Sequence, residues 1–262
     1  MIAKKSYTLI TGAGSGIGKA IALHLGKSKN IICLSKSSNC MEVAKLVGEN
    51  AKYLVCDLSD VDVSYETLNN FISDYDLQID SVIQAAGIIG QSGPIETTNF
   101  KDWEKVFKVN FFSSVMLAKL FIPKFKKQKF GKMIYFSGGG GAYGYPVLPQ
   151  YSASKTSLIR FVENIEMEIS QFEKISTVII APGAVETNMF KNVKEKEAEY
   201  GHSSSVRSFS TKENVAKFVS TLLDSDIKKL SGRLVHIKDN WNDFIQDKPT
   251  EDKFWKLRRI EN

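Results

Sequence analysis

Short apolar runs alternate with longer amphipathic segments along most of the chain. The apolar runs are rich in Ile, Val and Leu, and their length is typical of strands buried inside a sheet. They lie at residues 7–11, 30–35, 53–57, 81–86, 132–137, 177–181 and 233–237. Between these runs, apolar residues recur at helical spacing, which predicts helices at 17–27, 41–49, 64–75, 103–125, 152–172 and 213–223. Thr211 is a suitable N-cap for the last of these helices.

This alternation predicts the fold class. Continuous apolar strands separated by helices need crossover connections, and such connections produce a parallel sheet that is covered on both faces. We therefore predict an α/β protein with a doubly wound, seven-stranded parallel sheet and helices on both faces. No repeat and no linker rich in Pro, Gly or Ser divides the chain, so residues 1–262 are expected to form a single domain.

Two segments, 138–150 and 188–210, interrupt the alternation. The first begins with four consecutive glycines, Gly138 to Gly141, and the second is polar and charged. Both follow predicted strands at the carboxyl edge of the sheet, where open parallel sheets bind their ligands. We expect both to border a substrate, with 188–210 as a substrate-binding loop; ordinary solvent-exposed loops are the alternative interpretation.

Composition and charge exclude several classes of protein. Hydrophobic residues make up 43% of the chain and charged residues 24%, which is typical of a globular domain. The net charge of +6 is the one feature that suggests nucleic-acid binding, and the basic residues are scattered among acidic ones instead of forming one patch. We found no apolar run of about 18 residues and no signal-peptide pattern, which predicts a cytoplasmic protein without a membrane partner. The three cysteines and three histidines are too dispersed to predict a disulfide framework or a metal site.

A glycine-rich turn joins the first predicted strand to the first predicted helix. Its sequence is Thr11-Gly12-Ala13-Gly14-Ser15-Gly16-Ile17-Gly18. Such a turn lets the backbone approach a pyrophosphate, and the helix N-terminus offers free N–H groups to the same anion. Gly18 is expected to allow close packing of the helix on the strand. In this position the pattern favours a dinucleotide-binding site.

Tyr151 and Lys155 begin the helix predicted after the glycine run. Because they stand four residues apart, both side chains lie on one face and can reach one site. A phenol has an unperturbed pKa near 10 and exchanges protons poorly at neutral pH unless a nearby ammonium group stabilises its phenolate. The pair is therefore a candidate for acid–base chemistry, although an isolated Tyr/Lys pair can also be a surface contact.

Several further short motifs follow the strands in order. They are Asp57-Leu58, Ala85-Ala86-Gly87, Asn110, Tyr151-Ser152-Ala153-Ser154-Lys155 and Pro182-Gly183-Ala184-Val185-Glu186-Thr187. Together with the glycine turn, they resemble the short-chain dehydrogenase/reductase family along the whole chain. The resemblance implies a single-domain Rossmann fold and an NAD(P)-dependent oxidoreductase that interconverts a secondary alcohol and a ketone by hydride transfer.

The resemblance also assigns roles to individual residues. It implies that Tyr151 is the general acid/base, that Lys155 lowers the pKa of Tyr151 and binds the nicotinamide ribose, and that Asn110 supports the proton relay. The implied cofactor-binding residues are Gly12, Ser15, Gly16, Ile17, Gly18, Ser35, Lys36, Asp57, Leu58, Ala85, Ala86, Gly87, Tyr151, Lys155, Pro182, Gly183, Val185 and Thr187.

The sequence departs from the family at the catalytic serine. The commonest family spacing places this serine thirteen residues before the tyrosine, a position that Gly138 occupies here. Ser137 stands one residue earlier, at the end of a predicted strand, and we predict that it polarises the reacting oxygen after a register shift within the glycine run.

The end of the second strand bears on the choice of cofactor. An acidic residue there would bind the free ribose hydroxyls of NAD, but this chain has Ser35 and Lys36. Lysine flanked by hydroxyl groups suits a 2′-phosphate, which favours NADP(H) over NAD(H). Lys36 as a solvated loop cation is the alternative.

Substrate and assembly are predicted more coarsely. The glycine run and the segment 231–241 resemble family members associated with sugar and surface-polysaccharide metabolism, which suggests a sugar or nucleotide sugar as substrate. The alternatives are a 3-oxoacyl thioester reductase and a cofactor-binding regulator with impaired catalysis.

In this family the two long helices form the subunit interface, and here they carry apolar residues beyond one stripe, so we predict a homodimer or homotetramer. Those apolar residues are Phe111, Phe112, Val115, Leu117, Leu120, Phe121, Leu158, Ile159, Phe161, Val162 and Ile165.

Overall fold

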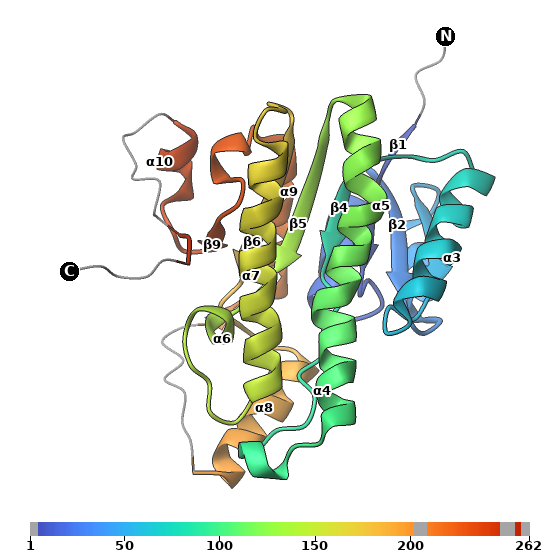
Figure 1. The fold of residues 1–262 in the computed structure, drawn as a ribbon. Coiled ribbons are helices and arrows are strands. Elements are labelled where there is room, and N and C mark those ends of the chain that lie inside the picture. Colours follow the sequence, from blue (N-terminus) through green and yellow to red (C-terminus); the bar gives the residue numbers. More distant parts are fainter. Residues whose placement is uncertain (1–4, 202–208, 247–254, 258–262) are drawn as a thin grey trace.

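A computed structural model describes residues 5–201, 209–246 and 255–257 of the chain (Figure 1). Its main sheet has seven strands in the order β3-β2-β1-β4-β5-β6-β9, and every neighbouring pair is parallel. The strands are β1 (Ser6–Thr11), β2 (Asn30–Ser35), β3 (Ala51–Val55), β4 (Gln78–Gln84), β5 (Gly131–Phe136), β6 (Ile175–Ala181) and β9 (Leu234–His236). The predicted fold class is confirmed. The strand order reverses between β1 and β4, which is where a doubly wound sheet opens a crevice for its ligand.

Helices cover both faces of the sheet (Figure 1). One hydrophobic core lies beneath α3 (Val61–Asp74), α5 (Ser113–Gln128) and α7 (Pro149–Ile169). The other core lies beneath α1 (Gly16–Leu25), α2 (Asn39–Val47) and α9 (Lys212–Asp224), whose N-cap is Thr211 as predicted. The remaining elements are η1 (Ile95–Thr97), α4 (Phe100–Phe107), η2 (Lys108–Phe112), α6 (Gly139–Ala142), β7 (Ala184–Val185), α8 (Asn188–Glu199), β8 (Phe209–Ser210), η3 (Lys228–Leu230) and α10 (Trp241–Ile245).

The continuous helical run Phe100–Gln128 joins α4, η2 and α5. Within the described ranges it is the one helix that is long and apolar enough to cross a membrane by length and composition alone. Its residues Leu117, Phe121 and Phe125 are fully buried in the core, so these side chains face the protein's own sheet.

This burial corrects one premise of the oligomer prediction. Seven of the eleven apolar residues on the two long helices lie in the chain's own core, so they present no surplus surface to another subunit: Leu117, Leu120, Phe121, Leu158, Ile159, Val162 and Ile165. Phe112 is 47% exposed, and Phe111 and Phe161 are partly buried in an edge-to-face contact.

A second correction concerns 188–210, predicted as an irregular segment. Its first half is the helix α8, whose polar composition conceals the few apolar residues of its inner face. Residues 202–208 lie outside the described part of the chain. The segment 138–150 is irregular as expected, apart from the single turn of α6 and the start of α7.

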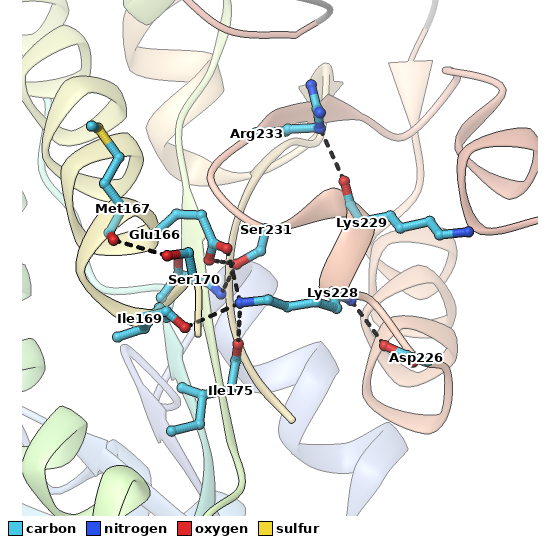
Figure 2. A network of polar contacts seen from close by, with 11 residues as sticks. Glu166, Met167, Ile169, Ser170, Ile175, Asp226, Lys228, Lys229, Ser231 and Arg233 are labelled. Atoms are coloured by element: carbon cyan, nitrogen blue, oxygen red, sulfur yellow. Dashed lines mark hydrogen bonds and ion pairs between the residues drawn. The ribbon is translucent and has the colours of Figure 1, made fainter. Parts of the chain in front are cut away.

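A polar network fixes the last strand of the sheet in place (Figure 2). The Lys228 ammonium donates to Glu166 Oε1 at 2.9 Å and to the carbonyl oxygen of Ile175 at 3.2 Å. The Ser231 hydroxyl donates to the other oxygen of Glu166 and accepts from the N–H of Thr177. These contacts join the end of α7 to β6 and to the turn before β9, so they determine where β9 meets the ligand crevice.

Candidate active site

A cavity of about 1070 Å³ opens at the carboxyl ends of the strands. The first turn of α1, the segments after β4, β5 and β6, and β9 all contribute to its lining, together with α7 and residues 255–257. Tyr151 and Lys155 both line it. The structure therefore brings the predicted acid–base pair and the edge of the glycine turn to one site.

The glycine turn has little room for side chains. Gly12 has a φ of +67°, and a Cβ there would lie 2.9 Å from the backbone of Ala86. A Cβ on Gly18 would overlap the carbonyl group of Gly12, so the close packing expected of Gly18 is against the turn itself. Both glycines keep the turn compact where the chain enters α1.

A phosphate group fits the space in front of this turn. Gly16 has a φ of +55°, and the nearest atom to a Cβ placed there is the Thr187 methyl group at 3.7 Å. The first N–H groups of α1 have no partners within the helix and carry its positive dipole end. Ile17, in this first turn, lines the cavity. A pyrophosphate between α1 and Thr187 would satisfy these donors, so the residues present fit a dinucleotide.

The predicted adenosine-binding residues gather at the ends of β2 and β3. Ser35 Oγ donates to the carbonyl oxygen of Ser37 at 2.8 Å, and Lys36 is exposed. The N–H of Ser59 donates to Asp57 at 3.0 Å and lowers the pKa of that carboxyl group, with a smaller contribution from Lys36. Leu58 is buried. The lysine and the carboxylate thus lie near each other at the carboxyl edge of the sheet, and neither lines the cavity that holds Tyr151.

The acid–base pair occupies the first two turns of α7. Lys155 is 4% exposed, and its ammonium donates to the carbonyl oxygen of Phe136 at 2.8 Å. It lies 5.8 Å from the centre of the Tyr151 ring. Burial raises the pKa of Tyr151 to about 12 and lowers the pKa of Lys155 to about 8. Burial thus moves the pKa of Tyr151 upward, opposite to the depression that the resemblance implied for the effect of Lys155.

Asn110 lies in η2, a π-helical stretch of the long helix in which the backbone hydrogen bonds span five residues instead of four. Its side chain accepts from the N–H of Ile88 and donates to the carbonyl oxygen of Ile88, both at 2.9 Å. It also donates to Ser154 Oγ at 3.0 Å. The amide therefore joins the segment after β4 to the helix that carries Tyr151.

The structure distinguishes Ser137 from Gly138. Ser137 Oγ is buried without a hydrogen-bond partner in the described structure, and a Cβ on Gly141 would overlap it. A Cβ on Gly138 would instead lie 3.7 Å from the Tyr151 hydroxyl. The φ of Gly138 is −171°, so the positive φ that a register shift would use is not found here. A hydroxyl group at position 138 would therefore lie near the phenol, while Ser137, which lines the same cavity, stays a prediction as the residue that polarises the reacting oxygen.

Sequence reasoning missed two residues that support the segment Ala85-Ala86-Gly87. Thr11 Oγ1 accepts from the N–H of Ala86 at 3.2 Å, and Gln84 Nε2 donates to the carbonyl oxygen of Ala86 at 3.1 Å. Both side chains are fully buried. A polar residue at the end of an otherwise apolar strand was the only signal available for either.

The residues after β6 form another wall. Gly183 has a φ of +72°, and a Cβ there would lie 3.3 Å from His236 Nε2. Thr187 Oγ1 accepts from the N–H of Phe190 and so begins α8. Pro182, Gly183, Val185 and Thr187 all line the cavity, as do Met189, Phe190 and Val193 of α8. His236 and residues 255–257, which the sequence analysis did not select, line it as well.

Comparison with known proteins identifies the family. The model of the short chain dehydrogenase family matches residues 6–198. The chain belongs to that family. Members are NAD(P)-dependent dehydrogenases and reductases that act on hydroxyl and keto groups, so this short-chain dehydrogenase is an NAD(P)-dependent oxidoreductase.

Two relatives in sequence span nearly the whole chain. The 3-oxoacyl-[acyl-carrier-protein] reductase of Buchnera aphidicola (subsp. Schizaphis graminum) is 29% identical over 238 residues, which cover 89% of this chain and 96% of the relative. An uncharacterized oxidoreductase of Schizosaccharomyces pombe is 30% identical over 248 residues, which cover 90% and 96%.

Solved structures share the fold. A 3-ketoacyl-ACP reductase from Sinorhizobium meliloti superposes with a TM-score of 0.78 at 25% identity and covers 88% of this chain and 96% of its own. An NAD⁺-bound xylitol dehydrogenase has a TM-score of 0.80 at 22% identity, with coverage of 90% and 99%, which shows the fold alone.

Proposed function

We propose that this short-chain dehydrogenase reduces a ketone that carries an apolar group to the corresponding secondary alcohol, and catalyses the reverse oxidation, with Tyr151 as the general acid/base. The observation that carries the proposal is that Tyr151, Lys155 and the first turn of α1, which follows the glycine-rich turn, meet at one cavity. A bound nicotinamide dinucleotide supplies the hydride for reduction and accepts it in oxidation.

The side chains of the site perform the proton transfer. With a pKa of about 12, the Tyr151 phenol keeps its proton at neutral pH and can donate it to the substrate oxygen as negative charge develops there. With a pKa of about 8, Lys155 is mostly charged at pH 7, so its ammonium stabilises the phenolate that donation leaves behind. Asn110 is a positioning residue, because its bonds to Ile88 and Ser154 fix the walls on either side of the phenol.

The lining of the cavity supports an apolar substrate more than a sugar. Beyond the residues that suit the dinucleotide, much of the wall is apolar: Ile89, Leu148, Met189, Phe190, Val193, Leu234, Trp255 and Leu257. The polar residues that line the same cavity are Tyr143, Tyr145, His236, Lys238, Asp239 and Lys256. An apolar group of the substrate would pack against the apolar side chains of this wall. The relatives named 3-oxoacyl-[acyl-carrier-protein] reductase support the same choice. We therefore favour 3-oxoacyl thioesters and related ketones over the nucleotide sugars suggested by the sequence.

NADPH is the proposed cofactor. Its support is the exposed Lys36 at the end of β2, where no carboxylate is present to bind the ribose hydroxyls of NADH. Solved neighbours have been obtained with NADP, with NAD⁺ and with NADH, so the family fold alone does not decide between them.

One observation favours a second function. Gly138 faces the Tyr151 hydroxyl and provides no hydroxyl group of its own, as expected of a cofactor-binding regulator with impaired catalysis. A turnover assay separates the two functions. Purified protein is mixed with NADPH or NADH and with 3-oxoacyl thioesters, simple ketones or keto-sugar nucleotides, and loss of the reduced nicotinamide is followed by absorbance. We expect NADPH oxidation with the first two substrate groups and none in the Tyr151→Phe variant. Cofactor binding without turnover on any carbonyl would establish the regulator instead.

We also propose that the protein is a homodimer or homotetramer. The support is the exposed Phe112 beside the partly buried Phe111 and Phe161 on the two long helices. Sedimentation equilibrium at micromolar concentration tests this, and a monomer would contradict it.

A further inference from the structure

The wall of the cavity formed by residues 255–257 is made of distant parts of the chain. Trp255 and Leu257 line the cavity, as do Leu234 of β9 and Ala142 of α6. These four side chains are apolar, and they come from elements outside the glycine turn and the segment after β4. None of the four is among the residues predicted to bind the dinucleotide.

Two side chains of α7 hold the main chain of Leu257. Glu163 Oε1 accepts from the N–H of Leu257 at 2.8 Å, and Arg160 donates to the carbonyl oxygen of Leu257, also at 2.8 Å. Arg160 and Glu163 form an ion pair with each other. Because both contacts reach backbone atoms, they fix the path of the segment whatever side chain stands at position 257.

Two further contacts anchor Trp255. The N–H of Leu234 donates to the carbonyl oxygen of Trp255 at 2.8 Å, and this bond holds the segment 255–257 against the edge strand β9. The Trp255 ring lies 4.3 Å from the ring of Phe244, centre to centre. Glu163 is 6% exposed, and a carboxylate at this depth is stable only while its hydrogen bonds and its ion pair are kept. The segment 255–257 is thus built into the fold.

We propose that Trp255 and Leu257 form the end wall of a subsite for the hydrocarbon part of the substrate, and that Arg160 and Glu163 are the positioning residues that hold this wall. The inference rests on the proposed ketone reduction and names its specificity determinant. An apolar group of the ketone enters beside Leu234 and Ala142, while the carbonyl group meets Tyr151. The position of Leu257 then limits the length of that group.

The test compares a series of aliphatic ketones of increasing chain length with full-length protein and NADPH. Leu257→Ala removes part of the wall, so we expect the ratio of kcat/KM for long to short ketones to rise about tenfold. Glu163→Ala releases the segment, so we expect a change in the same direction. Glu163→Gln retains an oxygen that accepts from Leu257 and should keep the wild-type ratio. Glu168→Ala, an exposed acid on the same helix, is the matched control and should change nothing.

An unchanged ratio in Leu257→Ala, with turnover retained, would overturn the subsite. A change in Leu257→Ala but not in Glu163→Ala would overturn the positioning role.

Amide hydrogen exchange at Leu257 tests the hydrogen bond from its N–H to Glu163 and needs no activity assay. Exchange should be slow in the wild-type protein, faster in Glu163→Ala, and as slow as wild type in Glu168→Ala. Equal exchange rates in all three proteins would show that Glu163 does not hold the backbone of Leu257. Absence of turnover by the wild-type protein on every ketone would instead contradict the proposed function, and with it the subsite.

Discussion

Gly138→Ser is the most informative substitution at this site, because it adds the hydroxyl group that the chain lacks opposite its phenol. A Cβ at position 138 lies 3.7 Å from the Tyr151 hydroxyl, and a serine oxygen is one bond further out. It can therefore approach the phenol, or a substrate oxygen beside the phenol, to the roughly 2.7 Å of an O–H···O hydrogen bond. With a φ of −171°, the backbone is extended and accepts serine without strain.

The size of the effect follows from electrostatic stabilisation of the reacting oxygen. Removal of one such donor from an enzyme costs about 10²–10³ in kcat. A donor added to an existing site is less well oriented, so we expect kcat for ketone reduction to rise about 10- to 100-fold, which corresponds to about 1.4 kcal/mol per factor of ten. The assay is steady-state NADPH oxidation on one ketone, with cofactor affinity measured separately.

Two control substitutions are made at the neighbouring positions. Gly139→Ser adds the same group one residue later, where no atom lies within 4 Å of the new Cβ, and it should leave kcat unchanged. Ser137→Ala removes a buried hydroxyl that has no hydrogen-bond partner in the described structure, and it should change kcat by less than about twofold. A large loss in Ser137→Ala, together with no gain in Gly138→Ser, would refute this reasoning and restore Ser137 as the catalytic hydroxyl.

Three further substitutions test the remaining parts of the site. Tyr151→Phe should lower kcat by about 10²–10⁴ and leave the calorimetric Kd of the cofactor unchanged, since it deletes only the proton-transfer group; near-normal turnover would contradict its role. Lys155→Met should lower both kcat and cofactor affinity. It should raise the free energy of unfolding at pH 7 by less than the ~3 kcal/mol that corresponds to the shift of the lysine pKa from 10.5 to about 8, because the hydrogen bond to the carbonyl oxygen of Phe136 is lost as well. The buried charge of Lys155 lowers the free energy of unfolding by its full amount below pH 8, and this loss disappears as the pH rises to 10.5. Urea unfolding should therefore show the variant to be more stable at pH 7 and not above pH 10.5. Lys36→Ala should weaken NADPH binding about tenfold more than NADH binding in titration calorimetry, and equal losses would exclude a contact with the 2′-phosphate.

Local periodicity predicted the sheet well because each buried strand shows its apolar run directly in the sequence. The start of β3 was an exception. Ala51 and Lys52 do not look like strand residues, and they belong to β3 because they pair with Ile31 and Ile32 of β2. The helix α8 was missed for a related reason: its mean character is polar, and only the face with Phe190 and Val193 meets the cavity.

The features that the sequence did not predict depend on contacts between distant residues. Leu257 is 97 residues from Arg160 and 94 from Glu163, so no window along the chain connects them. The orientations of Ser137 and Gly138 likewise depend on how α6 packs on α7. Gly140 approaches Ser152, and Gly141 approaches Ser137 and Lys155, so closely that neither position has space for a side chain. Spacing within a motif could suggest the catalytic serine but could not show which neighbour faces the phenol.

The helix α7 carries both Tyr151 and Glu163, which are twelve residues apart. At a rise of 1.5 Å per residue, it separates the two backbone positions by about 18 Å, and a helix of this kind does not stretch. Insertions in the surrounding loops, or exchange of the residues after β9, therefore leave the position of the phenol unchanged. Substrate range can diversify at one end of this helix while proton transfer is preserved at the other, which makes the C-terminal segment a suitable place to engineer selectivity without loss of chemistry.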